Sequence, residues 1–367
     1  MKKLLIANYL SPGDVVVLTA AIRDLHRNHP LQYLTDVDTT SSQIWENNPY
    51  IKKLKWKKDH YFGELPKDPK NNDQIPDYTY NNGIWNNSDK TKAIIHQNRT
   101  LFIKEPDIDV IHSEHDLINH CHKPFHYLHG PIQDLENKLN IRITPTEFKG
   151  DIHLSNEEKS WISQVEETGF KGNYWVILAG GKTDFTAKWW DPFRYQDVVN
   201  YFKGRIQFIQ CGEKNHWHPG LKNVIDLRGK TDIRQFIRLI YHADGVLCPI
   251  TFAMHLAAAV PTKPGKPSNR ACVVIAGGRE PSHWEAYPYH QFIHTCGALP
   301  CCDNGGCWFS RCQLVGDGDK KDTEGVCNNY SQVYKNLRIP KCMDMISVDM
   351  VIRRIEMYYE GGALKYY

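Results

Sequence analysis

The stretch GKTDIRQFIRLIYHADGVLCPITFAMHLAAAV, from Gly229 to Val260, indicates the fold most directly. Apolar side chains recur at helical spacing in its first half, at Ile233, Phe236, Ile237, Ile240 and Ala243. A short apolar strand follows at 246–248, and a helix of small residues runs from Met254 to Val260. In an open parallel sheet, ligands bind beyond the carboxyl ends of the strands, where a helix start offers free N–H groups to a phosphate. We therefore expect Thr251 to His255 to lie against a nucleotide diphosphate.

Strands and helices alternate on both sides of this stretch. We expect buried strands at 4–9, 32–36, 174–179, 206–210, 224–227 and 271–275, with helices between them. A chain of 367 residues is too long for one ordinary core. We therefore predict an α/β fold of two Rossmann-like doubly wound domains that face a cleft, a layout that suits a two-substrate transfer reaction. The predicted boundaries are 1–150, 151–296, a cysteine-rich segment at 297–345, and a C-terminal helix and tail at 346–367.

Three polar or glycine-rich features stand at predicted strand ends. Gly180-Gly181 and Gly277-Gly278 each end an apolar strand, where glycine lets the backbone approach a ligand or simply form a turn. Asp14 follows the first strand and begins a helix. It therefore has two interpretations: a cap that accepts backbone N–H groups, or a general base at the cleft.

Composition excludes several classes of protein. The formal charge of +3 and the pI near 8.2 are too mild for a nucleic-acid-binding protein. No apolar run approaches the roughly 20 residues that span a bilayer, so we expect no stable membrane insertion. The apolar run at 4–9 is short and is interrupted by Pro12 to Asp14, so we interpret it as a strand and expect a cytoplasmic protein.

Six of the eleven cysteines crowd one segment, at Cys301, Cys302, Cys307, Cys312, Cys327 and Cys342. In a reducing compartment this clustering favours a metal over disulfides. Four thiolates form a closed tetrahedral site that suits zinc or iron in a structural role. Our choice of ligands is Cys302, Cys307, Cys327 and Cys342, with Cys301 and Cys312 as alternatives. Reduced structural cysteines are the competing interpretation.

Four motifs in order resemble glycosyltransferase family 9, the ADP-heptose heptosyltransferases. They are SPGDVVVLTAAIRDLH (11–26), VILAGGKTDFTAKWWDPFRYQDVV (176–199), the stretch 229–260 with its MHLAAAV, and VVIAGGREPSHWEAYP (273–288). HTCGALPCCDNGGCWFSRC (294–312) and IPKCMDMI (339–346) resemble the iron-binding cysteine finger of the branch that heptosylates autotransporter proteins. The resemblance implies a B-type glycosyltransferase fold with the donor in the C-terminal domain.

The same resemblance implies roles for individual residues. Asp14 matches the family's proposed catalytic base, and Lys188 matches the lysine that contacts the donor diphosphate. The implied donor-binding set is Gly180, Gly181, Lys188, Thr251, Met254, His255 and Gly278. Competing interpretations are a surface lysine for Lys188 and a packed helix residue for His255. One departure concerns the turn at 249–252, which holds Pro-Ile-Thr-Phe where the family has an N-D-T-G-type turn with a sugar-contacting aspartate.

The implied reaction inverts the anomeric centre and uses no catalytic metal. Its donor is ADP-heptose, its acceptor is serine hydroxyls of an autotransporter protein, and the branch forms homo-oligomers. A lipopolysaccharide core heptosyltransferase, or a transferase of another sugar, is the alternative within the same chemistry. A non-catalytic metal-binding scaffold is the alternative from another class, and it would bind no nucleotide sugar.

Overall fold

The computed structural model describes residues 1–56, 59–61, 78–81, 84–87, 92–96, 99–105, 107–113, 125–333 and 336–366. The chain divides into two compact units. The first comprises 1–116 and 128–147, and the second comprises 117–127 and 148–367. Within the described residues, no helix is both long enough and apolar enough to cross a bilayer.

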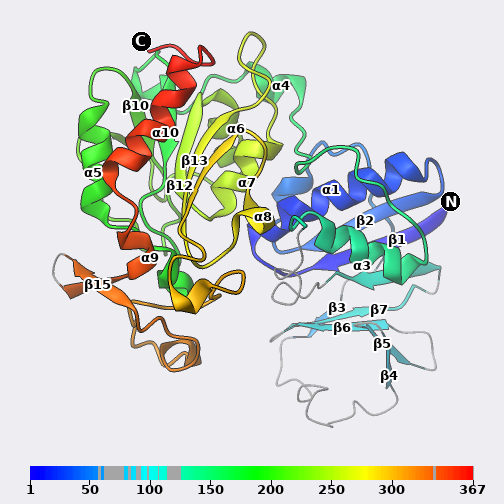
Figure 1. Cartoon of the computed structure of the whole chain (residues 1–367). Coiled ribbons are helices and arrows are strands. Elements are labelled where there is room, and N and C mark those ends of the chain that lie inside the picture. Colours follow the sequence, from blue (N-terminus) through cyan, green and yellow to red (C-terminus); the bar gives the residue numbers. More distant parts are fainter. Residues whose placement is uncertain are drawn as a thin grey trace. The chain divides into compact units, whose positions relative to one another are not determined.

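The first unit contains a parallel sheet in which β1 (Lys2–Asn8) lies between β2 (Tyr33–Thr39) and β8 (Ile108–His112). Helix α1 (Pro12–Asn28) joins β1 to β2 and packs against α3 (His129–Leu139) (Figure 1). Proline suits the first position of α1 because no intrahelical partner exists there for an N–H group. The apolar residues that follow it are buried, so α1 is held mainly by packing.

The chain between β2 and β8 contains the strands of a second, antiparallel sheet. Its order is β3-β7-β6-β5-β4, with bounds Asp59–Tyr61, Arg99–Ile103, Lys92–His96, Ile84–Asn87 and Tyr78–Asn81. Residues 66–89 are rich in Asn, Asp, Pro and Lys, a composition that predicts a surface loop, and this prediction is wrong for β4 and β5. Short strands rich in Asn and Tyr carry a weak alternation signal. The pairing of β4 with β5, and of β5 with β6, supplies what the local pattern lacks. The remainder of 66–89 lies outside the described residues.

The second unit is built on a six-stranded parallel sheet of order β11-β10-β9-β12-β13-β14. The strands are β9 (Tyr174–Ile177), β10 (Gln207–Gln210), β11 (Ile225–Asp226), β12 (Gly245–Pro249), β13 (Ala271–Gly277) and β14 (His290–His294). The earliest of these strands lies in the middle, so the order reverses between β9 and β12. This is the doubly wound arrangement that the sequence predicts for this half of the chain.

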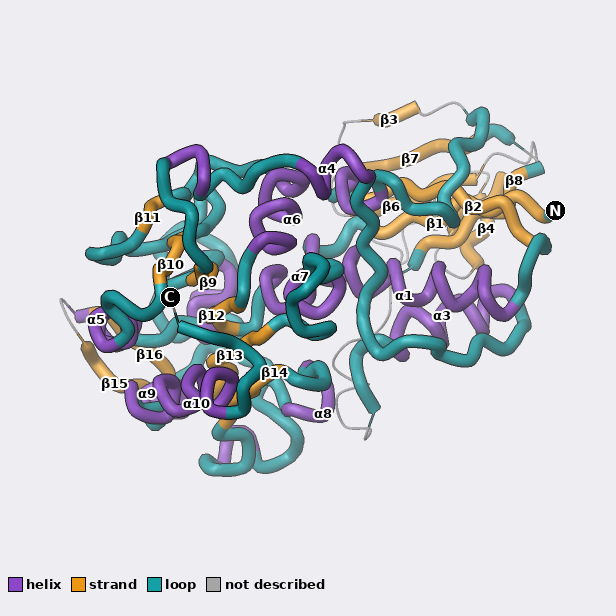
Figure 2. Tube along the Cα trace, turned by 90° about the horizontal axis from the view of Figure 1, so that it is seen from above, coloured by secondary structure: helices purple, strands orange, loops and turns teal. Residues whose placement is uncertain are grey.

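Helices cover both faces of this sheet. Figure 2 shows α5 (Pro192–Tyr201) and α10 (Val348–Glu360) on one face, with α6 (Ile233–His242) and α7 (Phe252–Ala259) on the other. Residues of α5 and α10 pack onto Trp175, Ile177, Val273 and Ile275 in one buried cluster. Because both faces are covered, β12 and β13 are buried at every residue and read as continuous apolar runs.

Side-chain caps explain where several of these helices begin. Asp191 accepts the N–H of Phe193 at 2.9 Å and precedes Pro192. Asp232 accepts the N–H of Gln235 at 2.7 Å, and Ser347 accepts that of Met350 at 3.2 Å. Such caps each contribute about 1 kcal/mol because they satisfy helix N–H groups that have no intrahelical partner. The Asp191-Pro192 pair predicts the start of α5, whereas apolar periodicity predicts α6 and α10.

The remaining elements are short. They are η1 (Ser42–Trp45), α4 (Asn156–Ser160), η3 (Glu166–Thr168), η4 (Thr183–Lys188), α8 (Ser282–Glu285), η5 (Pro300–Cys302), η6 (Lys320–Asp322), β15 (Tyr330–Val333), β16 (Leu337–Pro340) and α9 (Lys341–Asp344). The cysteine-rich segment at 297–345 belongs to the second unit. Strands β15 and β16 form a hairpin there, and the other segments lack regular structure over most of their length.

Candidate functional site

The carboxyl ends of β9, β12 and β13 lie at one edge of the six-stranded sheet, because adjacent strands are parallel. Lys188 follows β9, Thr251 follows β12, and Gly278 follows β13. The reversal of strand order lies at the same edge, which is where ligands bind in doubly wound folds. The tertiary structure therefore brings several members of the predicted donor-binding set to one end of one sheet.

An ion network lies at this edge. Lys188 Nζ lies 2.9 Å from Glu280 Oε1, and the same carboxylate pairs with Arg279. Glu280 is almost completely buried, whereas the Lys188 side chain is 21 % exposed. The second carboxylate oxygen, Glu280 Oε2, makes no hydrogen bond to the described residues. Burial lowers the pKa of Arg279 to about 10, and the guanidinium remains charged near neutral pH.

Thr251 precedes α7 in extended conformation. A threonine before a helix can cap it through its hydroxyl, yet the structure shows no capping hydrogen bond from Thr251. Thr251 Oγ1 is instead buried, with no partner in the part of the chain that the structure describes. Met254, predicted as a donor contact, is fully buried in α7. The start of this helix thus offers backbone N–H groups and one buried hydroxyl, while Met254 packs in the interior.

His255 lies in a buried aromatic cluster. Its Nδ1 lies 2.8 Å from the Tyr287 hydroxyl, and its Nε2 lies 3.8 Å from Glu285 Oε2. Burial lowers the pKa of His255 to about 3, so the ring is neutral near pH 7. A neutral imidazole cannot offer a full positive charge to a diphosphate. The geometry fits the packed-residue interpretation of His255, and its role at the donor stays a prediction.

The glycine pairs at 180–181 and 277–278 lie against other segments of the chain. A Cβ on Gly180, whose φ is +127°, would lie 2.0 Å from the Trp217 carbonyl oxygen. Gly181 exchanges two backbone hydrogen bonds with Trp217, at 2.9 and 3.1 Å. A Cβ on Gly278 would lie 3.0 Å from Cys302 Sγ. In these described contacts the glycines permit close packing of the loop at 213–219 and of the cysteine-rich segment.

The four predicted metal ligands line one small cavity together with Cys301. The sulfur of Cys302 accepts the N–H of Gly297 at 3.3 Å. Burial raises the pKa of Cys307 to about 11 and that of Cys342 to about 12, whereas a hydrogen bond from Cys312 lowers the pKa of Cys327 to about 7. No group of three or more His, Cys, Asp or Glu among the described residues has an arrangement that would hold a metal ion. The thiols converge, and a coordinating geometry is not formed.

Six histidines lie between positions 112 and 129, and the structure describes three of them. His115, His120 and His122 lie outside the described residues. His126 is buried, with its ring 4.9 Å from that of Tyr287 and 4.6 Å from that of Phe148. It therefore extends the aromatic cluster around His255.

Asp14 lies in the first turn of α1, in the first unit. Its Oδ2 accepts the backbone N–H of Ser11 at 2.9 Å, and the residue is only partly buried. Ser11 is the N-cap of α1, and Asp14 takes part in the capping box from the third helical position. A catalytic role is compatible with it, since the second carboxylate oxygen is not needed for this bond.

Glu280 and Arg279 were missed by the sequence analysis, although both stand in the quoted motif VVIAGGREPSHWEAYP. The available signal was a charged pair directly after a glycine turn at a strand end. That signal is ambiguous in one sequence, because charged residues are common in surface loops. Only burial distinguishes Glu280 from a solvated loop residue.

Residues 137–264 match the family model of glycosyltransferase family 9 (heptosyltransferase). The chain is a glycosyltransferase. The match begins in α3 and ends just after α7, so it includes β9, η4, β12 and the two predicted motifs that carry Lys188 and Thr251. None of the curated protein sequences matches this glycosyltransferase significantly.

Solved structures share the fold. The family 9 glycosyl transferase from Veillonella parvula DSM 2008 is 14% identical, with 98% of each chain covered and a TM-score of 0.58. The ADP-heptose lps heptosyltransferase II of E. coli is 12% identical, with 99% of this chain and 100% of that enzyme covered and a TM-score of 0.52. The iron-containing dodecameric glycosyltransferase TibC of enterotoxigenic E. coli H10407 is 12% identical, with 97% of this chain and 76% of TibC covered and a TM-score of 0.53. The predicted α/β fold of family 9 type is thereby confirmed.

Proposed function

We propose that this glycosyltransferase moves a heptose from ADP-heptose to a hydroxyl acceptor, with inversion at the anomeric carbon. The observation that carries the proposal is Lys188, a partly exposed cation at the carboxyl edge of a doubly wound sheet, inside the segment that matches the heptosyltransferase family model. A TibC structure with ADP-D-beta-D-heptose has the same fold, with 13% identity and a TM-score of 0.52.

The proposed reaction uses three groups of this chain. Asp14 accepts the proton of the acceptor hydroxyl, and that oxygen forms a bond to the anomeric carbon as the bond to the diphosphate breaks. ADP leaves with the bonding electron pair. Lys188 and the N–H groups at the start of α7 stabilise the charge on the departing diphosphate. No metal takes part in these steps.

Binding of nucleotide sugars tests the proposal against a non-catalytic scaffold. A thermal-shift screen with ADP-, UDP- and GDP-sugars should show stabilisation by ADP-heptose and a smaller effect of the other two nucleotides. Ligand that binds only the folded state raises the free energy of unfolding by about 2.7 kcal/mol at 100 times its dissociation constant. Absence of stabilisation by every nucleotide sugar would support the scaffold.

For the acceptor, we propose serine hydroxyls of an autotransporter protein. The support is the resemblance of the cysteine-rich run to the autotransporter O-heptosyltransferase branch. A lipopolysaccharide core acceptor is the second candidate, favoured by the fold shared with heptosyltransferase II. Heptose transfer to a purified passenger protein, compared with transfer to lipopolysaccharide core, distinguishes the two. The proposed homo-oligomer rests on the fold shared with dodecameric TibC and is measurable by light scattering.

We further propose a structural iron or zinc ion on Cys302, Cys307, Cys327 and Cys342. These thiols converge on one cavity, and soft thiolate donors suit both metals. Metal binding must deprotonate the buried thiols and draw them together, because their described arrangement does not coordinate an ion. The ion would then act as a staple for a loop-rich segment.

Elemental analysis of the purified protein should find about one iron or zinc per chain. Cys302→Ser should lose the metal and lower the melting temperature, while Cys296→Ser serves as the control, since Cys296 does not line the cavity. A stable, metal-free wild-type protein would reject the proposal. Loss of metal in Cys301→Ser but not in Cys302→Ser would indicate that Cys301, rather than Cys302, is the ligand.

A further inference from the structure

The segment that carries Lys188 is not a regular helix. η4 (Thr183–Lys188) has a break at Phe185, where φ is −130° and ψ is 54°. Its backbone hydrogen bonds run from Phe185 to Lys182 and from Trp189 to Thr186, at 3.2 and 3.1 Å. Runs of 3₁₀ structure are short because their hydrogen bonds are poorly aligned. Contacts from outside the segment must therefore hold it in place.

The cysteine-rich segment supplies those contacts. The Thr186 hydroxyl donates to the Gln313 carbonyl at 2.8 Å and accepts the Cys312 N–H at 2.9 Å. The Ala187 N–H donates to the Ser310 carbonyl at 3.1 Å. Thr186 is fully buried, so its hydroxyl has no water to replace these partners. These bonds end one residue before Lys188.

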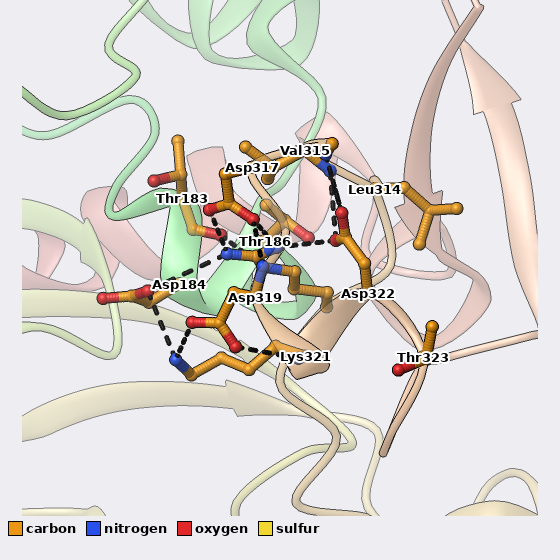
Figure 3. A network of polar contacts seen from close by, with 12 residues as sticks. Thr183, Asp184, Thr186, Leu314, Val315, Asp317, Asp319, Lys321, Asp322 and Thr323 are labelled. Carbon is orange, nitrogen blue, oxygen red and sulfur yellow. Dashed lines mark hydrogen bonds and ion pairs between the residues drawn. The ribbon is translucent and has the colours of Figure 1, made fainter.

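Arg311 holds the other end of the segment. Its fully buried guanidinium donates to the Thr183 carbonyl at 3.2 Å and to the carboxylates of Asp317 and Asp322 at 2.6–2.8 Å. Figure 3 shows Asp317, Asp322 and Asp184 converging on this network, with Lys321 bridging Asp184 and Asp319. The hydrogen bonds that Arg311 donates to Asp317 and Asp322 raise the pKa of Arg311. A buried charge that is paired in this way is costly to disturb.

The same segment also holds the turn that carries Glu280. The N–H groups of Cys307 and Trp308 donate to the carbonyls of Gly278 and Arg279, at 3.4 and 3.3 Å. Arg279 Nε donates to the Phe309 carbonyl at 2.6 Å. Residues 307–313 therefore contact both the segment of Lys188 and the turn of Glu280.

We propose that residues 307–313 form a brace that positions Lys188, with the Thr186 hydroxyl and Arg311 as its positioning groups. The inference rests on the proposed role of Lys188 at the donor diphosphate. A lysine side chain is long and flexible, so the position of its backbone decides which point its charge reaches. A displacement of about 1 Å at a reacting group can lower a rate by about 100-fold. The brace thus gives the cysteine-rich segment a task in catalysis that needs no contact with substrate.

A double-mutant cycle between Thr186 and Lys188 tests the brace, with ADP as the probe in isothermal titration calorimetry. Thr186→Val keeps the side-chain shape and removes the hydroxyl, and we expect ADP binding to weaken about 10-fold, within the coupling range of neighbouring residues. Thr186→Ser, which keeps the hydroxyl, should restore binding. In the Lys188→Ala background, Thr186→Val should leave ADP affinity unchanged, although it still lowers the melting temperature.

Equal loss of ADP affinity from Thr186→Val in both backgrounds would overturn the positioning role and leave the proposed function intact. ADP affinity of Lys188→Ala equal to that of the wild type would instead remove the proposed role of Lys188 itself. If Thr186→Val does not fold, Asp184→Asn at the half-exposed rim of the network gives the same cycle with an expected factor of about 2 to 3.

Discussion

Replacing Lys188 by alanine should weaken ADP binding by about 10- to 100-fold, because a charged hydrogen bond contributes roughly 1.5–3 kcal/mol. The loss should be larger for turnover of ADP-heptose, since negative charge grows on the diphosphate as its bond to the sugar breaks. Calorimetry with ADP and an assay of ADP release measure the two effects. Lys320→Ala is the matched control, because Lys320 forms an exposed surface pair with Glu324.

The ion pair of Lys188 with Glu280 provides a second prediction on ADP binding. Glu280 forms an ion pair with the Lys188 ammonium group, so a bound diphosphate must compete with the Glu280 carboxylate for that group. Glu280→Gln removes the competing charge and should tighten ADP binding several-fold at low salt, while lowering the melting temperature because Arg279 loses its counter-charge. Weaker ADP binding in Glu280→Gln would contradict competition and would indicate that the carboxylate holds Lys188 in its binding position.

Replacing Asp14 by asparagine should lower turnover by about 100- to 10,000-fold and leave ADP-heptose binding intact. A general base contributes a factor of this size because it removes the acceptor proton in the transition state. Asparagine keeps an oxygen that can accept the Ser11 N–H, so the cap of α1 survives the substitution. Steady-state kinetics with acceptor, together with the donor dissociation constant, separate the two effects.

Asp14→Ala provides the comparison, since it removes both the base and the cap. Its melting temperature should fall by an amount equivalent to about 1 kcal/mol relative to Asp14→Asn, the usual contribution of a helix cap. Both variants should be equally inactive. If Asp14→Asn keeps most of the wild-type turnover and only Asp14→Ala loses it, then Asp14 is a structural cap and another residue is the base.

Most elements of the second unit were predictable from local patterns. Ile233, Phe236, Ile237 and Ile240 recur at helical spacing, and the structure places α6 there. Asp191-Pro192 is a recognisable helix start, and α5 begins at Pro192. The inserted antiparallel sheet was not predictable, because β4 depends on its pairing with β5, and β5 on its pairing with β6, rather than on their own sequence pattern.

Thr251 and Asp14 were predicted as site residues because each follows an apolar strand, and a strand end in a parallel sheet has a known place in the fold. Lys188 was predicted only through its match to the lysine of the family that the sequence resembles. Periodicity and capping act between residues a few positions apart, so a single chain displays them directly. The pairing of Lys188 with Glu280 and the bonds of Thr186 to the cysteine-rich segment join residues far apart in the chain. Such contacts form only when the sheet is assembled, because burial and distance, rather than residue type, make a carboxylate the partner of one particular lysine.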